Sequence, residues 1–138
     1  AGRPDMSVLR FIKWIDEGQP LEVFGDGSQS RDWTYVDDIA NGVIASMRNV
    51  GYEIINLGGG KNPISLRQMI TWMEEALGKK AQLEHKPFHN ADLRDTWADI
   101  SKARRLLDWE PKTSAREGVF QTVKWYRENS DLMRLLKL

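Results

Sequence analysis

The sequence predicts a mixed α/β fold, of the α+β kind, in a single domain that spans residues 1–138. Three observations support this class: apolar residues recur at helical spacing, short β-branched and aromatic runs fall between them, and glycine or proline separates the two. Helices that alternate with short strands favour this arrangement over a β-sandwich or a helix bundle. With 138 residues, 41% of them hydrophobic, the chain can form one core of its own.

The first predicted helix covers Ser7–Glu17 and ends before Gly18. Its apolar face consists of residues three or four positions apart, namely Val8, Phe11, Ile12 and Ile15. Residues 21–24 follow as a strand that ends in a glycine turn, and residues 31–36, rich in aromatic and β-branched side chains, form a second extended piece.

A second helix is expected to begin with a cap at Asp37 or Asp38 and to run to about Arg48. Four apolar residues at spacings of three and four are expected to face inward: Ile39, Val43, Ile44 and Met47. Residues 53–57 then predict a strand, closed by the three glycines at 58–60.

The clearest helix signal in the chain lies between Ser65 and Gly78. Ser65 and Gln68 fit a capping box, in which the serine hydroxyl accepts from a backbone N–H of the first turn. The apolar stripe that follows is formed by Leu66, Met69, Ile70, Met73 and Leu77. Gly78 supplies the stop.

The last third of the chain predicts a short strand and two further helices. The strand covers residues 81–86, and the first helix covers residues 99–107 with Asp99 as its cap. The second helix runs from Ser114 to about Arg127, with Ser114 and Glu117 as its capping box. The tail 131–138 either frays or continues this helix.

Composition excludes several classes of protein. Twenty basic and twenty acidic residues cancel, so no net field draws the chain to nucleic acid or to an anionic membrane. Cysteine is absent, so no disulfide framework exists, and no apolar run approaches the roughly 18 residues of a membrane span. The N-terminal segment is polar and contains proline, so it is not expected to be a signal peptide. We therefore expect a cytoplasmic protein without a nucleic-acid or membrane partner.

The sequence contains none of the common cofactor or catalytic motifs. A dinucleotide-binding loop needs G-x-G-x-x-G, but Ser30 and Pro63 stand where the third glycine of the two candidate loops belongs. No tyrosine has a lysine four residues later, so a Tyr-Lys acid–base pair is missing. His85 and His89 lack the glutamate of a zinc helix, and no G-x-S-x-G elbow occurs. No metal site or catalytic residue is expected.

Four motifs carry a resemblance to a known family. They are the glycine turn followed by Arg31-Asp-Trp33, the segment Arg3-Pro-Asp-Met6, Ala98-Asp-Ile-Ser-Lys-Ala103 and Trp109-Glu-Pro-Lys-Thr113. Together they resemble the NAD-dependent nucleotide-sugar epimerases and dehydratases, which are extended short-chain dehydrogenases, and most of all the UDP-glucuronate and UDP-glucose 4-epimerases. The resemblance implies the C-terminal, substrate-binding part of such an enzyme. The Rossmann half with the glycine fingerprint and the Tyr-Lys pair, which normally lies upstream, is expected to be absent.

The resemblance also implies a substrate-binding role for ten residues. Glu22, Val23 and Phe24 correspond to the backbone edge that meets the uracil, Arg31 to the diphosphate contact and Asp92 to the ribose contact. A planar guanidinium can give two parallel bonds to phosphate oxygens, and a carboxylate can accept from two adjacent hydroxyls. Asp5 and Met6 match positions near the diphosphate and the sugar, Trp33 matches an aromatic next to the ribose, and His89 stands where a second arginine is common. Arg3 is a hypothesis of its own: a cation that selects a uronic acid.

Each of these assignments has a simpler structural alternative. From local features alone, Arg31 is a surface or salt-bridged arginine, and Asp37 and Asp38 are helix caps. The glycines at 58–60 could form a phosphate loop, but a strand end that enters a turn explains them better.

The expected parent reaction is NAD-dependent 4-epimerisation of a UDP-sugar. NAD is expected in the intact parent and not on this fragment alone, which should be inactive. Its expected partners are the UDP-sugar, the missing NAD-binding half and a second copy, as a homodimer or through self-association. Two alternatives remain: part of a dTDP-sugar 4,6-dehydratase or UDP-sugar decarboxylase, and a non-enzymatic oligomerising module.

Overall fold

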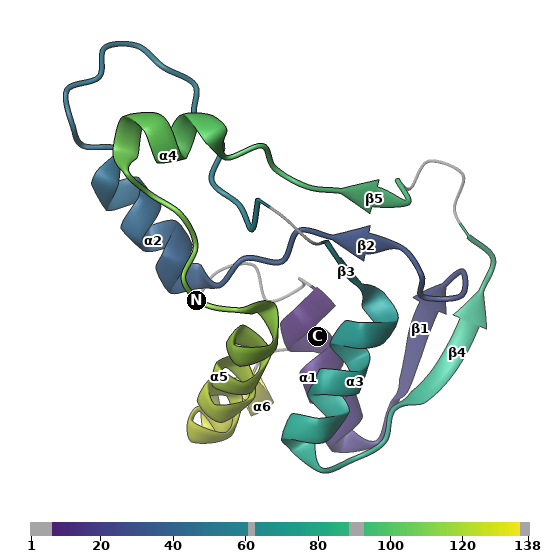
Figure 1. Ribbon diagram of the computed structural model, residues 1–138. Coiled ribbons are helices and arrows are strands. Elements are labelled where there is room, and N and C mark those ends of the chain that lie inside the picture. Colours follow the sequence, from purple (N-terminus) through teal and green to yellow (C-terminus); the bar gives the residue numbers. More distant parts are fainter. Residues whose placement is uncertain (1–6, 61–62, 89–92, 136–138) are drawn as a thin grey trace.

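A computed structural model describes residues 7–60, 63–88 and 93–135 of the chain (Figure 1). Its elements in chain order are α1 (Ser7–Glu17), β1 (Pro20–Phe24), β2 (Ser30–Arg31), α2 (Val36–Ala45), β3 (Ile64–Ser65), α3 (Leu66–Leu77), β4 (Gln82–Lys86), β5 (Asp95–Thr96), α4 (Ser101–Leu107), α5 (Ala115–Glu128) and α6 (Ser130–Leu135). The predicted mixed α/β class is confirmed. Within the described residues, no helix is both long enough and apolar enough to cross a membrane.

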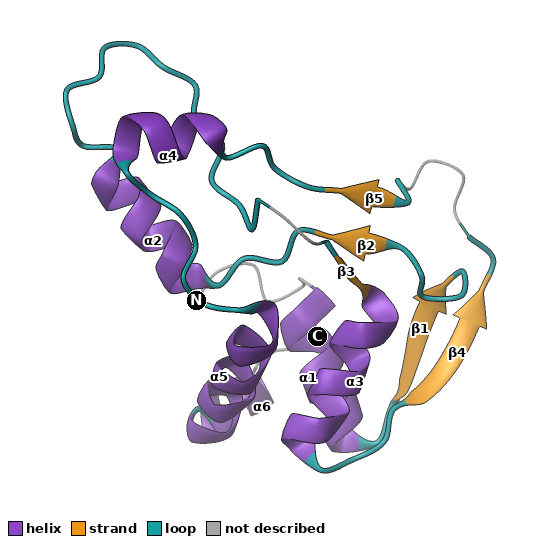
Figure 2. Cartoon of the chain, in the orientation of Figure 1, coloured by secondary structure: helices purple, strands orange, loops and turns teal. Residues whose placement is uncertain are grey.

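The strands form two small sheets (Figure 2). In the first, β1 and β4 run parallel, with Pro20 opposite Gln82 and Phe24 opposite Lys86. In the second, β2 lies between β3, to which it is antiparallel, and β5, to which it is parallel. The glycine turn after β1 leads directly into β2 and so joins the two sheets.

The main core lies between the first sheet and helices α1, α3 and α5, which gather on one side of it (Figure 1). Its buried members come from β1 and the three helices: Phe11, Ile12, Ile15, Leu21, Val23, Met69, Ile70, Met73, Leu77, Val119, Val123 and Tyr126, with Met133 of α6. The predicted apolar stripes of α1 and α3 thus face this core, apart from Val8 and Leu66, which are half-buried against it.

A second, smaller core lies at the opposite end of the molecule, where α2 and α4 meet (Figure 1). Ile100, Ala103, Leu107 and Trp109 are buried there, and Leu57 packs against them. The indole Nε1 of Trp109 donates to the backbone carbonyl of Asp38 at 3.0 Å. This bond joins the end of α4 to the first turn of α2.

Several predicted helix ends are confirmed. The hydroxyl of Ser65 accepts from the N–H of Gln68, and that of Ser114 accepts from the N–H of Glu117, both at 3.2 Å. Gly78 ends α3 in the left-handed conformation, with φ at 69°. The tail continues as α6 as far as Leu135.

The predicted cap of α2 is wrong. Tyr35 precedes the helix and makes no side-chain capping bond, and both aspartates lie within the first turn. Asp38 is instead buried, and its two carboxylate oxygens accept from the backbone N–H groups of Lys112 and Thr113 at 3.1 and 2.9 Å. The competing partners lie 74 and 75 residues away, so no local pattern could indicate them.

The inward face predicted for α2 is wrong for three of its four residues, while Ile39 is half-buried. The helix ends at Ala45, and Val43, Ile44 and Met47 are each more than half exposed. Gly42 faces inward, where its absent side chain lets Leu57 and Trp109 approach. The small residue, and not the large ones, therefore marks the packed side of this helix.

Three predicted extended or capped segments differ in extent. Residues 53–57 form no strand, because no described strand pairs with them. Residues 31–36 pair only at Arg31, after which the chain enters α2 at Val36. Helix α4 begins at Ser101, two residues later than expected, although the Asp99 carboxylate does accept from the Ser101 N–H at 2.9 Å.

Candidate functional site

Arg31 lies in the central strand of the second sheet. It is opposite Ile64 of β3 on one side and Thr96 of β5 on the other. Its Nη1 donates to the carbonyl of Ser30 at 2.7 Å and to the carbonyl of Arg94 at 3.2 Å. These contacts hold the guanidinium at the start of β5, half-buried.

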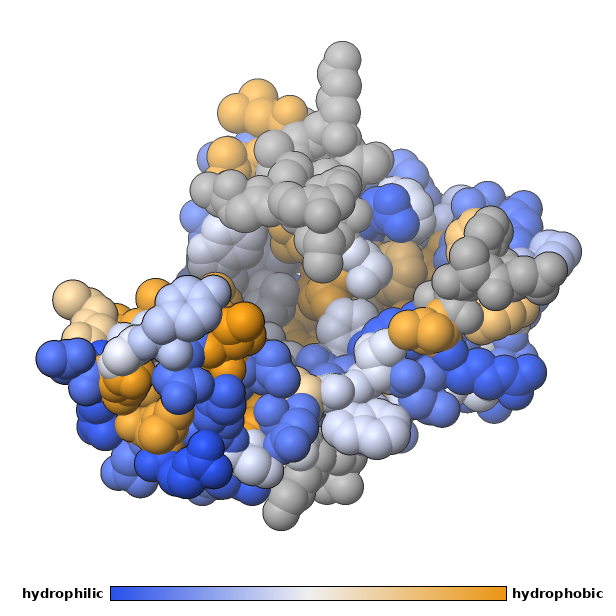
Figure 3. Space-filling view, turned by 90° about the horizontal axis from the view of Figure 1, so that it is seen from above, coloured by the Kyte–Doolittle hydropathy of each residue, from blue (hydrophilic) through white to orange (hydrophobic). Residues whose placement is uncertain are grey.

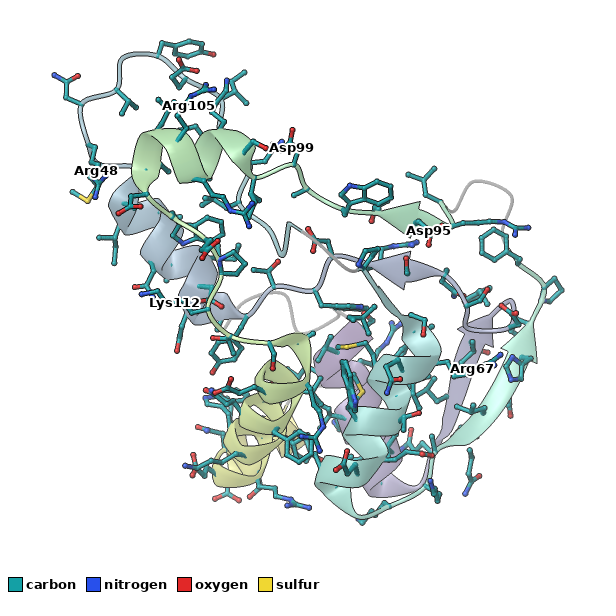
Figure 4. All side chains as sticks on the ribbon, viewed as in Figure 1. Arg48, Arg67, Asp95, Asp99, Arg105 and Lys112 are labelled. Atoms are coloured by element: carbon teal, nitrogen blue, oxygen red, sulfur yellow. The ribbon has the colours of Figure 1, made fainter. Side chains whose placement is uncertain are left out.

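Ser30 and Asp95 join the central strand β2 to its neighbour β5. The backbone N–H of Ser30 donates to the Arg94 carbonyl at 2.8 Å, and its hydroxyl donates to the Asp95 carboxylate. Ser30 is buried, whereas Asp95 is exposed on β5 (Figure 4). The backbone that carries Arg31 is therefore attached to β5 by both main-chain and side-chain bonds.

Asp32 connects three segments at the other end of β2. Its Oδ2 accepts from the backbone N–H groups of Gly60 at 3.0 Å and Ala98 at 2.9 Å. Asp32 therefore joins the end of β2 to the glycine segment and to the residues before α4, directly beside Arg31. Sequence reasoning gave Asp32 no role, although it stands inside the Arg31-Asp-Trp33 motif.

The glycine turn is attached to the first turn of α3. The N–H groups of Leu66 and Arg67 donate to the carbonyls of Gln29 and Gly27, each at 3.0 Å. The Arg67 side chain, which lies between α3 and β1 in Figure 4, donates from Nη2 to the carbonyl of Asp26 at 2.7 Å. The loop before Arg31 is thus held by a helix of the main core.

The backbone conformation and the nearby Phe88 ring explain why the first residue of that turn is glycine. Gly25 has φ at +80°, and a Cβ there would lie 2.9 Å from Cδ2 of Phe88. His85 Nδ1 lies 2.8 Å from the Gly25 carbonyl, the geometry of an Nδ1–H donor. The turn is therefore packed against the end of β4 and the residues after it.

The predicted base-binding residues have distinct environments. Val23 is buried in the main core, and Glu22 is exposed with its carboxylate 3.5 Å from Lys86 Nζ. Phe24 has an exposed ring, and its carbonyl accepts from Gln29 Nε2 at 2.8 Å. The side chains of Glu22 and Phe24 are therefore accessible to solvent, whereas that of Val23 is not.

Trp33 lies on the core side of the second sheet. Its indole Nε1 donates to the Ile64 carbonyl at 3.2 Å, and its ring packs against the main core. The five remaining predicted site residues lie outside the described residues: Arg3, Asp5, Met6, His89 and Asp92. Arg31 and Trp33 flank Asp32 at the end of β2, and the glycine turn connects β2 to the end of β1.

Charges near the turn shift two pKa values. Hydrogen bonds from the Ser28 hydroxyl and backbone lower the pKa of the exposed Asp26 carboxyl below its usual value. The carboxylate of Glu84, followed by that of Glu22, raises the pKa of Lys86. Both shifts favour the charged form of the group, so Asp26 and Lys86 remain ionised near neutral pH.

The glycines at 58–60 do not form a cradle for a dinucleotide phosphate. A Cβ on Gly58 would lie 2.6 Å from Ala98 Cβ, and one on Gly60 would lie 2.4 Å from Ile100 Cδ1. The chain itself therefore occupies the space that a pyrophosphate would need. Among the described residues, no cluster of three or more His, Cys, Asp and Glu side chains could hold a metal ion.

A pocket of about 320 Å³ lies elsewhere, between α1, α5 and α6, with Asp16, Tyr126, Arg127 and Met133 among its lining residues. The Tyr126 hydroxyl donates to Asp16 Oδ2 at 3.1 Å inside it. None of the sequence motifs lies at this pocket. The candidate site is therefore the junction of β2 and β5 around Arg31.

Comparison with known proteins decides the family. The model of the family described as GDP-mannose 4,6 dehydratase matches residues 3–122. The chain belongs to this family. The GDP-mannose 4,6-dehydratase family match covers β1, the glycine turn, Arg31 and most of the helices, so the candidate site lies inside it.

Relatives in this family carry more specific names. The chain is 59% identical over its whole length to UDP-glucuronate 4-epimerase of Thermodesulfobacterium geofontis, of which it covers 43%. Its structure is similar to UDP-glucuronic acid 4-epimerase from Bacillus cereus in complex with UDP-glucuronic acid and NAD, with TM-score 0.79 and 39% identity over 89% of this chain and 41% of that one. It is also similar to dTDP-glucose 4,6-dehydratase from Bacillus anthracis in complex with NAD, with TM-score 0.85 and 26% identity over 97% of this chain and 43% of that one. The chain therefore spans well under half the length of these relatives.

Proposed function

We propose that this chain forms the UDP-sugar-binding part of an NAD-dependent nucleotide-sugar 4-epimerase of the UDP-glucuronate or UDP-glucose type. The main support for the proposal is the position of Arg31. Its guanidinium donates to the carbonyls of Ser30 and Arg94, which hold it at the junction of β2 and β5. In this role it binds the diphosphate, with Trp33 near the ribose and the end of β1 near the uracil. The names of the relatives support a UDP-sugar and NAD in the full-length protein.

The contribution of this part to catalysis is to grip and orient the substrate. A guanidinium held in place before the ligand arrives loses little side-chain entropy when it binds two phosphate oxygens. A fixed diphosphate in turn restricts where the sugar can lie relative to the nicotinamide that NAD supplies for hydride transfer. The described residues hold no acid–base pair for that transfer, which we assign to the part of the protein that the relatives carry in addition.

A calorimetric titration of the folded chain with UDP-glucuronate, UDP and dTDP tests the proposal. The UDP ligands should bind, and Arg31→Ala should weaken them about 10- to 100-fold, because a charge-assisted hydrogen bond contributes about 1.5–3 kcal/mol. Arg104→Ala is the matched control, since Arg104 lies on α4 and pairs with Glu110 at 3.1 Å. Equal affinity of the wild type and the Arg31 variant, with circular dichroism unchanged, would refute the role of Arg31.

The dTDP arm addresses the alternative of a dehydratase, which the similarity to the Bacillus anthracis enzyme keeps open. Clearly tighter binding of dTDP than of UDP would favour the dehydratase over the 4-epimerase. A further titration with UDP-glucose addresses Arg3, because Arg3→Ala should reduce the preference for UDP-glucuronate over UDP-glucose if this residue selects a uronic acid.

A further inference from the structure

The glycine turn of residues 25–28 joins two parts of the candidate site. Strand β1 ends just before it, at Phe24, and β2 begins soon after it and carries Arg31. In the proposed function, the end of β1 meets the base of the ligand and Arg31 meets its diphosphate. The conformation of the turn therefore sets the spacing between the two contacts that a single nucleoside diphosphate would make.

Burial alone does not fix this turn. Of its four residues only Gly27 is buried, and the surface at the β1–β4 end of the molecule is mainly hydrophilic, in contrast to the end that carries α2 and α4 (Figure 3). Gly25 and Gly27 both have positive φ, at +80° and +79°. Because glycine can adopt many other backbone conformations, specific contacts have to select this one.

Two side chains from different elements hold consecutive carbonyl groups of the turn. The Gly25 carbonyl lies 2.8 Å from Nδ1 of His85, on β4, and a carbonyl can only accept, so this nitrogen carries the proton. The Asp26 carbonyl accepts from Nη2 of Arg67, on α3, at 2.7 Å. We call the side chains of His85 and Arg67 the turn clamp.

The two elements that carry the turn clamp are themselves held in place. Strand β4 is paired with β1 along its whole length, from Gln82 to Lys86. Helix α3 packs in the main core, and the backbone N–H of Arg67 also donates to the Gly27 carbonyl, at 3.0 Å. The turn is therefore attached to a strand and to a helix, neither of which contains a proposed ligand contact.

We propose that His85 and Arg67 are positioning residues of the proposed UDP-sugar site. Through the turn, they keep the end of β1 and Arg31 at the spacing that one nucleoside diphosphate requires. The proposal rests on the proposed function, which supplies the two contact points. Binding at the first point makes binding at the second an intramolecular step with a high effective concentration. A turn that is already ordered also lowers the entropy that binding costs.

This role predicts which ligands the turn clamp affects. UDP reaches both contact points, whereas uridine and inorganic pyrophosphate each reach only one. His85→Ala should therefore weaken UDP about three- to tenfold and leave uridine and pyrophosphate within about twofold of the wild type. A purely structural role would weaken all three ligands together, in step with a fall in the thermal midpoint.

Titrations of the folded chain measure this pattern, by calorimetry for UDP and by NMR for uridine and pyrophosphate. Arg67→Ala should give the same pattern in about 0.3 M salt, which screens the charge lost with the guanidinium. Leu83→Ala and Arg116→Ala are the matched controls, because Leu83 is an exposed residue of β4 and Arg116 is an arginine of α5 that pairs with Glu75. Neither control should change the affinity for UDP.

A conservative variant and a double variant test the shared role of the two residues. His85→Asn keeps an N–H donor at the same number of bonds from the backbone as Nδ1, so it should restore most of the UDP affinity that His85→Ala loses. The double variant His85→Ala/Arg67→Ala should weaken UDP less than the product of the two single effects, because both contacts hold one turn. Multiplicative effects together with no rescue by asparagine would overturn the shared role.

The outcomes separate this proposal from the one on which it rests. Arg31→Ala can weaken UDP binding while neither clamp variant alters it, or the clamp variants can weaken pyrophosphate as much as UDP. Either result refutes the positioning role and leaves the proposed function standing. If the folded wild-type chain binds no UDP, both proposals fail.

Discussion

Asp32 and Gly60 are joined by a hydrogen bond of 3.0 Å between the carboxylate Oδ2 and the backbone N–H. The same oxygen accepts from the N–H of Ala98 at 2.9 Å. One side chain thus holds together the end of β2, the glycine segment and the residues that lead from β5 to α4.

Asp32→Ala should lower the free energy of unfolding by about 1–3 kcal/mol, because two partly buried N–H groups lose their acceptor. Asp32→Asn keeps an oxygen that can accept both bonds, so it should cost clearly less. Urea denaturation of both variants measures the difference. Equal losses for alanine and asparagine would show that the charge, and not the two hydrogen bonds, stabilises this junction.

Gly60→Ala should destabilise the chain by about 2–4 kcal/mol, because a left-handed alanine and a forced shift of Ile100 add together. The added Cβ would lie 2.4 Å from Ile100 Cδ1, and Gly60 has φ at +72°. Gly51→Ala is the matched control, since Gly51 has φ at +75° and no atom within 4 Å of its Cβ position. That variant should lose only about 1 kcal/mol. The difference between the two in denaturant unfolding isolates the contact with Ile100.

Asp38→Ala should lower the free energy of unfolding by about 2–3 kcal/mol, because the buried N–H groups of Lys112 and Thr113 then lack an acceptor. Asp37→Ala removes the neighbouring exposed carboxylate and should cost less than about 1 kcal/mol. If both variants lost the same amount, the helix terminus and not the connection to α5 would be the source of the effect.

Alkaline pH should weaken the fold through Tyr126. Burial, with the nearby Asp16 carboxylate, raises the pKa of Tyr126 to about 12. In the unfolded chain the phenol ionises near its ordinary pKa of about 10, so stability present below about pH 10 is lost as the pH rises toward 12. The loss from this residue is about 2–3 kcal/mol. The melting temperature, measured from pH 9 to about 11, should fall less steeply with pH for Tyr126→Phe than for the wild type. An equal slope for the two proteins would contradict the assignment.

Local patterns predicted the parts of the fold that depend on local interactions. Ser65, Gly78 and Ser114 mark helix ends through bonds to residues three or four positions away, so sequence reasoning found α3 and α5. The two-residue strands β3 and β5 escaped it, because only their pairing with β2 makes them strands. The mistaken strand at 53–57 has the converse cause: its alternation is correct, but no described partner completes it.

In the candidate site, too, local motifs could be predicted from the sequence, whereas long-range partners could not. Arg31 and the glycine turn were found through a motif, whereas the partners that fix them, Asp95 and the carbonyl of Arg94, lie more than 60 residues away. Asp38 was assigned to a cap because aspartate at the start of a helix usually serves there. Its actual partners follow α4, and only the folded chain brings them within reach.

The way in which the glycine turn meets α3 limits how this corner of the molecule can attract an anion. The first three N–H groups of α3, those of Leu66, Arg67 and Gln68, already donate to the carbonyls of Gln29 and Gly27 and to the Ser65 hydroxyl. The positive end of the helix dipole is therefore closed to a phosphate, unlike that of a phosphate-binding helix. Attraction at this corner then comes from side-chain cations, among them the guanidinium groups of Arg31 and Arg67 and the ammonium of Lys86. Ionic strength, and not acidity, should then control how tightly a phosphorylated ligand is held.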